Sequence, residues 1–376
     1  MRYCPNCLQP DTRPNTVFTS DGICPACDYF SRLQYIDWQE RYEILLDLIK
    51  RFPRKPGQMF DCIIGVSGGK DSTRQALWVR DKLGLKPLLA CLTYPPEQVT
   101  ERGTQNISNL IELGFDVVIS SPAPQTWRRL MHEGFMRFTN WCKSTELALF
   151  SSVPQLAIRY NIPLILWGEN PGLQLGDLKT LGRTGYDGNN LRFMNTLAGG
   201  ALDWIIDSGF ELKELIPYQY PTLDDFDRYG LQIVYLGWFL GDWSLVNNGM
   251  YAASAGLQLR EDTVANTGDL HGVTSLDEDW VTLNQMIKYY KFGFGRVTDY
   301  ANEEIRLGRM SRAAAIELVE QHDDACGDNY IEAFSDYIGL TVEQFWTKVR
   351  TSVNRQLFDV RPDGRITRRF KVGVGL

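Results

Sequence analysis

Several features that identify large classes of protein are absent from these 376 residues. No run of about 18 apolar residues occurs, so we expect no membrane span. The first residues contain no apolar segment of the kind that a secretory signal needs, and we therefore expect a cytoplasmic protein. The nucleotide-binding loop G-x-x-x-x-G-K-[ST] is missing, and the dinucleotide fingerprint G-x-G-x-x-G follows no predicted strand.

Histidine is scarce as well. His132, His271 and His322 share no metal-binding spacing, and no Ser-His-Asp or Cys-His-Glu arrangement is apparent. An N-terminal cysteine nucleophile is also absent, because position 2 is Arg2. We therefore expect no built-in glutaminase in this chain.

Basic residues are outnumbered by acidic ones. The 39 Lys and Arg residues against 46 Asp and Glu residues give a formal net charge of -7. We do not expect a nucleic-acid partner, because such proteins usually carry a basic field. The densest basic stretch is 365–371, which we interpret as a solvated tail, with a local phosphate-binding patch as the alternative.

Half of the eight cysteines form a regular pattern. Cys4, Cys7, Cys24 and Cys27 make two C-x₂-C pairs, each with a proline after its first cysteine. Two such turns aim four thiolates at one point and fill a tetrahedral zinc site. Since so short a segment cannot build its own core, we expect Zn²⁺ to stabilise it as a structural zinc ribbon. An iron–sulfur cluster and redox-active pairs are the alternatives.

The most informative stretch is Ile63–Ser72, which reads IIGVSGGKDS. Its apolar start predicts a buried strand, and a helix-like run begins at Ser72. A strand, a glycine-rich turn and a helix N-terminus together make an anion site, because free backbone N–H groups point outward there. Gly68 and Gly69 allow close approach of a phosphate, Ser67 and Ser72 add hydroxyls, and Lys70 adds a cation. Asp71 is placed to orient the loop or to hold Mg²⁺.

This string resembles the SGGxDS pyrophosphate loop (PP-loop) of ATP-pyrophosphatases, which cleave ATP between the α and β phosphates. The resemblance implies ATP as a ligand and the adenine-nucleotide alpha-hydrolase, or HUP-like, fold. A glycine-rich turn without a ligand is the alternative.

The following residues alternate between strand and helix patterns, which predicts an α/β fold with a doubly wound parallel sheet. We expect strands at 60–66, 87–93, 117–120, 162–167 and 233–239, and helices at 38–52, 72–84, 104–113, 124–138, 143–160 and 243–255.

Ligands of such sheets bind at the carboxyl ends of the strands. We therefore expect the loop to share one rim with Thr93 and with Gly168-Glu169-Asn170. Thr93 is a candidate for adenosine contact, Gly168 for the cofactor site, and Glu169 for Mg²⁺ or substrate binding. Plain strand termini and a helix cap are the alternatives for these residues.

The less regular segment 171–230 is long enough to act as a binding element or lid. Beyond it, the aromatics Tyr235, Trp238, Phe239 and Trp243 favour a core over a sugar-binding surface.

Residues 274–354 read as mainly helical, with two glycines inside the segment Lys291–Arg296. Basic side chains gather in this region and could neutralise a phosphate-rich substrate, although a solvated helical face explains them equally well. They are Lys291, Arg296, Arg306, Arg309 and Arg312.

Four motifs in this order resemble the N-acetyl sugar amidotransferase family. They are the four-cysteine segment, Val-Ser-Gly-Gly-Lys-Asp-Ser at 66–72, Trp-Gly-Glu-Asn at 167–170, and Tyr-Lys-Phe-Gly-Phe-Gly-Arg at 290–296 with Ile-Arg-x-Gly-Arg after it. The family includes WbpG-type enzymes of lipopolysaccharide O-antigen synthesis and PseA-type enzymes of flagellin glycan synthesis.

The resemblance implies ATP-dependent conversion of an acetamido group to an acetamidino group on a nucleotide-linked sugar of the UDP-diacetamido-uronic acid type. It implies ammonia from a separate glutaminase related to that of histidine biosynthesis, with a cyclase-like subunit. Lys70 and the loop amides would hold the β and γ phosphates, Asp71 and Glu169 would bind Mg²⁺, and Lys291 or Arg296 would stabilise developing charge.

We accordingly divide the chain into a zinc ribbon at 1–30, a helix and linker at 31–58, an ATP-binding domain at 59–250 and a mainly helical substrate-binding region at 251–376. Two other functions are consistent with parts of the sequence. One is a tRNA-modifying thiolase or lysidine-type enzyme, for which Cys142 and Cys326 are the nearest candidate nucleophiles. The other is a non-enzymatic scaffold that uses the zinc ribbon for protein contact.

Overall fold

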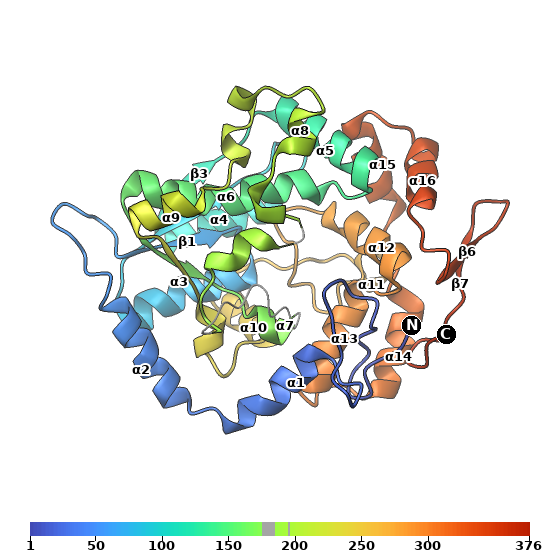
Figure 1. The fold of residues 1–376 in the computed structure, drawn as a ribbon, viewed down its shortest axis with the longest axis horizontal. Helices are drawn as coiled ribbons and strands as arrows, with labels where there is room; N and C mark the ends of the chain where they lie inside the picture. Colours follow the sequence, from blue (N-terminus) through green and yellow to red (C-terminus); the bar gives the residue numbers. More distant parts are fainter. Residues whose placement is uncertain (175–184, 195) are drawn as a thin grey trace.

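A five-stranded parallel sheet lies at the centre of the computed structural model, which describes residues 1–174, 185–194 and 196–376 (Figure 1). The strand order is β3-β2-β1-β4-β5, so the strand that precedes the glycine loop is the middle one. The predicted fold class, a parallel α/β sheet between a four-cysteine segment and a helical C-terminal part, is confirmed. The strands are β1 (Cys62–Val66), β2 (Pro87–Leu92), β3 (Asp116–Ser120), β4 (Leu164–Trp167) and β5 (Gln232–Tyr235).

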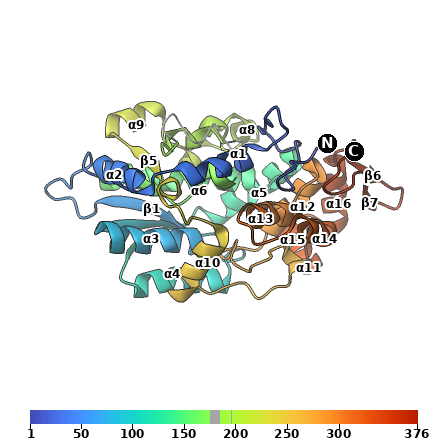
Figure 2. The same cartoon turned by 90° about the horizontal axis from the view of Figure 1, so that it is seen from below.

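Both faces of the sheet are covered, because successive side chains of each strand point to opposite sides. Ile63 of β1 packs in the core that contains α6 (Cys142–Tyr160), whereas Ile64 packs in the core that contains α3 (Lys70–Leu83). Figure 2 shows α6 on one side of β1 and α3 on the other. This burial of both faces explains the nearly continuous apolar runs of the strands.

The predicted helices of the first half lie where the sequence pattern puts them, with one informative difference. The helix after β1 begins at Lys70 and not at Ser72, because Gly69 already serves as its N-cap. Lys70 and Asp71 therefore belong to the first helical turn. The other predicted helices are α2 (Trp38–Ile49), α4 (Glu101–Glu112), α5 (Pro124–Phe138) and α10 (Leu245–Ser254). The structure adds the shorter helices α1 (Pro25–Arg32), α7 (Pro171–Gln174), α8 (Asp203–Ile206) and α9 (Leu223–Tyr229).

The C-terminal part is mainly helical, as predicted, and it packs against the first residues of the chain. Leu8 is fully buried in a core with C-terminal residues, and its N–H donates to Asn302 Oδ1 at 2.7 Å. Figure 1 shows the two chain ends close together. The elements are α11 (Val264–Thr267), α12 (Val281–Phe292), α13 (Arg296–Arg306), α14 (Arg312–His322), α15 (Asp328–Ile338), α16 (Val342–Thr351), β6 (Phe358–Val360) and β7 (Ile366–Arg368).

The strand predicted at 233–239 is too long. β5 ends at Tyr235, and a 3₁₀ turn covers Leu236–Phe239. Its partner β4 ends at Trp167, which pairs with Tyr235, so no strand remains for pairing further along. The predicted core role of the aromatics is confirmed for Phe239 and Trp243, which are 4% and 2% exposed.

The interpretation of 365–371 as a solvated tail holds for its basic side chains, because all of them are exposed, but the backbone of the stretch is not a free tail. Residues 366–368 form β7, which pairs with β6, and Phe370 is 4% exposed in the core that also contains Leu8. The arginines of this stretch pair with nearby acids, for example Arg368 with Glu320 at 3.1 Å. The hairpin returns the chain to its N-terminus, which a charge pattern alone could not indicate.

Within the described ranges, every helix is too short or too polar to cross a bilayer. The predicted lid at 171–230 includes 175–184 and 195, which lie outside the described residues. The rest of that segment contains short helices and 3₁₀ turns. The domain boundaries at 30, 58 and 250 stay predictions.

Gly295, the second of the two glycines between Lys291 and Arg296, lies directly against another backbone segment. A Cβ at Gly295 would lie 1.9 Å from the carbonyl oxygen of Asp323, and the Gly295 N–H donates to Asp323 Oδ2 at 2.8 Å. Any side chain here must push apart two backbone segments, which the dense interior resists.

We expect Gly295→Ala to lower the free energy of unfolding by at least about 3 kcal/mol, since overpacking against backbone cannot relax. The matched control is Gly114→Ala, where φ is +91° and no atom lies within 4 Å of the new Cβ. That control should lose only about 1–2 kcal/mol from the left-handed backbone. Equal losses in urea unfolding of the two variants would contradict the packing argument.

Candidate active site

The glycine loop lies where the winding of the sheet reverses. The chain runs from β1 outward to β3 and then returns to the other side of β1 as β4. The carboxyl ends of β1 and β4 therefore flank a crevice, which is the place where open α/β sheets bind ligands. A cavity of about 220 Å³ occupies it. Its walls come from the loop after β1, the segment after β4, the side of α6 and the segment 273–277.

The backbone of the loop leaves the first amides of α3 uncapped. Gly68 has φ +75°, a left-handed conformation that favours glycine, and a Cβ there would lie 3.0 Å from Asn106 Cβ. Gly69 is the N-cap of α3 but offers no side chain to cap it, and the first helical bond runs from Thr73 N to Gly69 O. The amides of the first turn are therefore available to a ligand, as at other anion-binding helix ends.

A polar network fixes the charged residues of the first turn. Lys70 Nζ lies 2.8 Å from Asp71 Oδ2, and Asp71 Oδ1 accepts a 2.6 Å hydrogen bond from Asn248 Nδ2. Asn248, on α10, is completely buried and accepts in turn from Arg74, which pairs with Asp242. The network pins α10 to α3 and orients the Asp71 carboxylate. No sequence signal pointed to Asn248, which is far from Asp71 along the chain.

The segment after β4 supplies a second carboxylate. Glu169 lines the same cavity as Lys70 and Asp71, as the shared rim predicted. Burial, followed by the negative charge of Asp71, raises the pKa of Glu169 to about 7. Gly168 also lines the cavity, and a Cβ there would lie 2.7 Å from Gln75 Oε1. Asn170 points away from the cavity and accepts from Leu173 N at the start of α7.

A segment of the C-terminal part forms another wall of the cavity. Residues 273–277 line it, and Thr100 of the loop between β2 and α4 donates to the carbonyl oxygens of Leu276 and Asp277. Burial raises the pKa of the Asp277 carboxyl to about 6. Sequence reasoning missed Asp277, because its acidic neighbours make it read as the polar start of α12.

Arg296 holds this segment from behind. Its guanidinium donates to Thr267 O and to Ser275 Oγ, and the side chain is buried. Asp269 folds the same segment by accepting from the backbone of His271 and Thr274. Arg296 therefore shapes the wall without lining the cavity, and its predicted role in stabilising charge stays a prediction.

Thr93 faces a smaller neighbouring cavity of about 110 Å³. Ser67 and Asp277 line both cavities, so the two adjoin at the loop. The smaller one has mostly apolar walls, among them Leu92 and Ile107. An apolar slot beside an anion site suits a flat ring attached to phosphates.

The predicted basic residues of the C-terminal part do not converge on the glycine loop. Lys291 lines a different cavity, where its Nζ donates to Phe138 O and Thr139 O at 2.6 and 2.9 Å. The three arginines further on are engaged within the protein, with Leu173 O, Glu304 and Gly373 O as partners. They are Arg306, Arg309 and Arg312.

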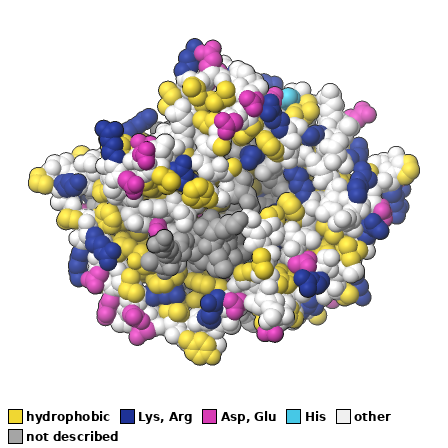
Figure 3. All heavy atoms as spheres, viewed as in Figure 1, with side chains coloured by type: hydrophobic (Ala, Val, Ile, Leu, Met, Phe, Trp, Pro, Cys, Tyr) yellow, Lys and Arg dark blue, Asp and Glu magenta, His cyan; other side chains and the backbone are white. Residues whose placement is uncertain are grey.

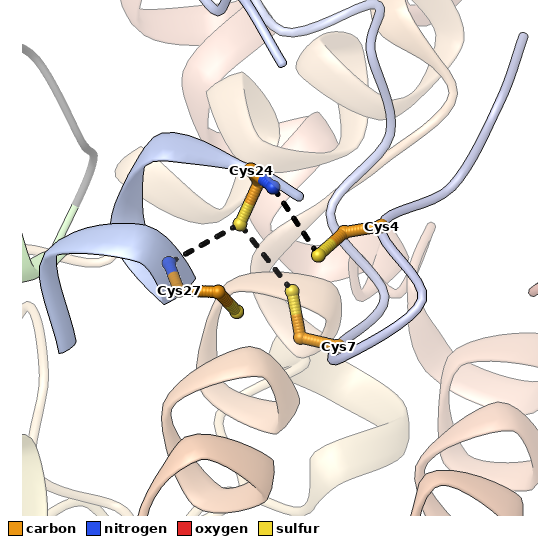
Figure 4. A group of neighbouring side chains, drawn as sticks. All are labelled: Cys4, Cys7, Cys24 and Cys27. Atoms are coloured by element: carbon orange, nitrogen blue, oxygen red, sulfur yellow. Dashed lines mark hydrogen bonds between the residues drawn. The ribbon is translucent and has the colours of Figure 1, made fainter. Parts of the chain in front are cut away.

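The four paired cysteines converge as the spacing predicted (Figure 4). The ligand atoms of Cys4, Cys7, Cys24 and Cys27 all lie within 4.8 Å of one another, and the side chains are buried. The Sγ atoms of Cys7 and Cys24 are 3.7 Å apart. This is a group that can hold a metal ion or cluster.

The cysteine group also supports one side of the cavity. Helix α1, which contains Cys27, packs against α7, the helix that follows Glu169 and Asn170. Tyr29 of α1 contacts Asn170 Nδ2 through its hydroxyl at 3.4 Å. Loss of the group would therefore disturb the segment that holds Glu169.

Residues 271–370 match the family described as LPS biosynthesis protein WbpG-like, C-terminal domain. The match includes the segment 273–277 that forms a wall of the cavity, and also Lys291 and Arg296. No curated protein matches this chain.

Two solved structures match this chain with low TM-scores. One is the NMN synthetase from Francisella tularensis, with 14% identity, a TM-score of 0.29, and coverage of 61% of this chain and 99% of that one. The other is the U34-tRNA thiolase NcsA from Methanococcus maripaludis with its [4Fe-4S] cluster, with 11% identity, a TM-score of 0.28, and coverage of 90% and 95%.

The raised pKa of Glu169 predicts a pH-dependent stability. The folded chain holds the Glu169 proton up to about pH 7, whereas the ordinary value is 4.5. Between these values the folded state binds more protons than the unfolded state, so this residue makes the free energy of unfolding fall as pH rises. Glu169→Gln removes the effect.

We expect Glu169→Gln to be more stable than the wild type near about pH 8, and the difference to vanish near about pH 4.5. Urea unfolding in buffer without magnesium measures both values. The exposed Glu343 of α16 gives the control, Glu343→Gln. An advantage of Glu169→Gln that is equal at both pH values would contradict the burial of this carboxyl.

Proposed function

We propose that this chain is an ATP-dependent N-acetyl sugar amidotransferase. It would convert an acetamido group of a nucleotide-linked sugar, of the UDP-diacetamido-uronic acid type, into an acetamidino group for surface polysaccharide synthesis. The observation that carries the proposal is the composition of the cavity at the glycine loop. One wall is a helix N-terminus with Lys70, and another wall, 273–277, belongs to the segment that matches the WbpG-like domain.

The loop side supports ATP as the first substrate. The uncapped amides of α3 and the Lys70 ammonium can donate hydrogen bonds to the β and γ phosphates. Lys70 has three N–H donors, and Asp71 takes one of them. The apolar slot beside Thr93 and Ser67 is a suitable place for the adenine. Gly69 lines this cavity at the start of α3, and its lack of a side chain leaves the backbone there open to the phosphates.

The reaction has two steps. The acetamido oxygen attacks the α phosphorus of ATP, the bond from that phosphorus to the β-phosphate oxygen breaks, and pyrophosphate leaves with the electron pair. Ammonia then adds to the activated carbon, AMP leaves with the former carbonyl oxygen, and the nitrogen loses a proton to give the amidine. The free amides and Lys70 lower the barrier by offsetting phosphate charge in a preorganised site.

Asp71 and Glu169 fit a divalent cation. They line one cavity, and the charge of Asp71 helps to raise the pKa of Glu169, so a cation would relieve the repulsion between them. These carboxylates would hold Mg²⁺, which neutralises phosphate charge when bound. Asn248 would keep the Asp71 carboxylate oriented toward it.

Zinc fits the cysteine group better than a cluster does. A tetrahedral ion with Zn–S bonds of about 2.3 Å needs sulfur atoms about 3.8 Å apart. The Cys7–Cys24 separation of 3.7 Å and the upper limit of 4.8 Å for the group meet this requirement. In a [4Fe–4S] cluster each of the four cysteines binds a different iron, so the sulfur atoms must lie further apart than they do around a single ion. We therefore propose a structural Zn²⁺ with four thiolate ligands.

Ammonia would come from a partner, because the sequence contains no glutaminase arrangement. We propose a glutaminase subunit related to that of histidine biosynthesis, together with a cyclase-like subunit, and a cytoplasmic location where ATP and nucleotide sugars are available. No nucleic acid takes part in the proposed reaction.

Two observations disfavour a tRNA thiolase. Burial raises the pKa of Cys142 far above its usual range and that of Cys326 to about 12, so neither supplies a thiolate. On the face in Figure 3, Lys and Arg side chains are interspersed with Asp and Glu side chains. A tRNA enzyme needs a basic surface that follows the phosphates.

We expect Lys70→Ala to lower ATP-dependent pyrophosphate release by at least about 100-fold, because it removes a cation aimed at the phosphates. The assay contains ATP, ammonium and a panel of UDP-acetamido sugars, and mass spectrometry follows the replacement of O by NH in the sugar. The control Lys82→Ala removes an exposed lysine from the same helix and should leave the rate unchanged.

Normal turnover of a folded Lys70→Ala variant would remove the loop from the mechanism. Pyrophosphate release from the wild type without any sugar product would refute the amidotransferase. The absence of pyrophosphate under all conditions would instead support a scaffold.

Metal analysis tests the zinc assignment. We expect about one zinc ion per chain, and we expect Cys24→Ser to lose it and to unfold at a lower temperature, because the segment has little core besides the metal. Cys62→Ser changes a buried cysteine of β1 outside the group and should retain the zinc. Iron in place of zinc would contradict the zinc assignment.

A further inference from the structure

A second, larger cavity opens away from the glycine loop. It has a volume of about 310 Å³ and lies between the N-terminal segment 13–16, the first turns of α6 and one face of α12. This volume is at the lower end of the range for pockets that bind small molecules, about 300–1,000 Å³. Of the predicted site residues, Lys291 is the one that lines it.

The lining of this cavity contains polar atoms without partners. Asn284 Oδ1 and Gln285 Oε1 are both buried and accept no hydrogen bond from any described residue. Such atoms are expensive to bury unless something donates to them. Hydroxyl and amide N–H groups of a small polar molecule would satisfy both.

Lys291 adds a positive charge at the same cavity. Its ammonium donates to two backbone carbonyls but forms no ion pair with a carboxylate of the described residues. The neighbouring cations differ in this respect, because Lys288 and Arg13 both pair with Asp299. Lys291 is therefore available to an anionic group of a ligand, and Phe292 adds an aromatic side chain to the lining.

The two cavities are neighbours along α6. Cys142 and Glu146 line the second cavity, whereas Leu149, Phe150 and Val153 line the cavity at the glycine loop. Glu146 and Phe150 are four residues apart and lie on the same helical face, about 6 Å from one another along the axis.

We infer that the second cavity binds the acetamido-bearing sugar ring of the substrate, with an anionic substituent on Lys291. Asn284 and Gln285 accept hydrogen bonds from the ring, and the acetamido group extends past Glu146 toward the glycine loop. The inference rests on the proposed function and names the ring-binding site that it needs. Either a ring carboxylate or the phosphate at the anomeric carbon would provide the negative charge.

Binding of three sugars to the full chain, without ATP, tests the inference. The probes are N-acetylglucosamine, N-acetylglucosamine 1-phosphate and 2-acetamido-2-deoxyglucuronic acid, measured by titration calorimetry. We expect at least one anionic sugar to bind at least about tenfold more tightly than the neutral one, since a charge-assisted hydrogen bond adds this much. Which anion binds more tightly identifies the source of the charge.

Lys291→Met should abolish this tenfold preference for an anionic sugar. Gln285→Leu should weaken the binding of all three sugars several-fold and leave the preference unchanged. Lys348→Met is the matched control, because Lys348 lies close enough to lower the pKa of Lys291 but does not line the cavity. The dissociation constant of ATP should stay within about twofold in all variants. Gln285→Leu keeps the test valid if loss of the Lys291 contacts at the end of α5 destabilises the fold.

Unchanged sugar binding in both variants, or equal binding of neutral and anionic sugars by the wild type, would overturn the inference. The proposed function fails separately. Turnover with an unchanged KM for sugar in both variants would leave the function and refute this site. Sugar binding that follows the predicted pattern without any turnover would support this site and refute the proposed function.

Discussion

Unsatisfied backbone amides at the start of α3 are the constraint on which the rest of this structure depends. The helix begins directly after Gly68 and Gly69, and its first N–H groups have no acceptor among the described residues. A ligand with negative charge is the natural partner for such N–H groups. The surroundings support this end from several directions. Asn248 of α10 holds the Asp71 carboxylate in place, and Gly168 lets the end of β4 lie close to Gln75 of α3. The segment 273–277 forms another wall of the cavity. Each contact brings a remote part of the chain to the same few atoms.

The two ends of the chain pack against each other, and both support walls of the cavity. The cysteine segment packs on the C-terminal helices, and α1 passes from it to α7 beside Glu169. A metal ion in the cysteine group would thus stabilise one wall of the cavity, while Arg296 stabilises another through Ser275. Two elements far from the glycine loop in sequence therefore hold its ligand-binding walls in place.

Local patterns predicted the sheet, the glycine loop and the four-cysteine group, because each depends on residues close together in the chain. They could not predict partners that only the fold brings together, such as Asn248 for Asp71 or Asp277 in another wall of the loop's cavity. The sequence showed the basic residues Lys291 and Arg296 but not their neighbours in the fold. Lys291 lines the second cavity, whereas Arg296 supports the segment 273–277 through Ser275. The charge pattern at 365–371 correctly indicated exposed basic side chains, but it could not indicate the strand β7 or the burial of Phe370.

The fate of one oxygen atom tests the central claim most directly. A substrate whose acetamido oxygen is ¹⁸O is incubated with ATP and ammonium, and the AMP and pyrophosphate are analysed by mass spectrometry. If the amide oxygen attacks the α phosphorus held at the glycine loop, the label leaves in AMP. Label in pyrophosphate, in inorganic phosphate or in water, with none in AMP, would contradict the account.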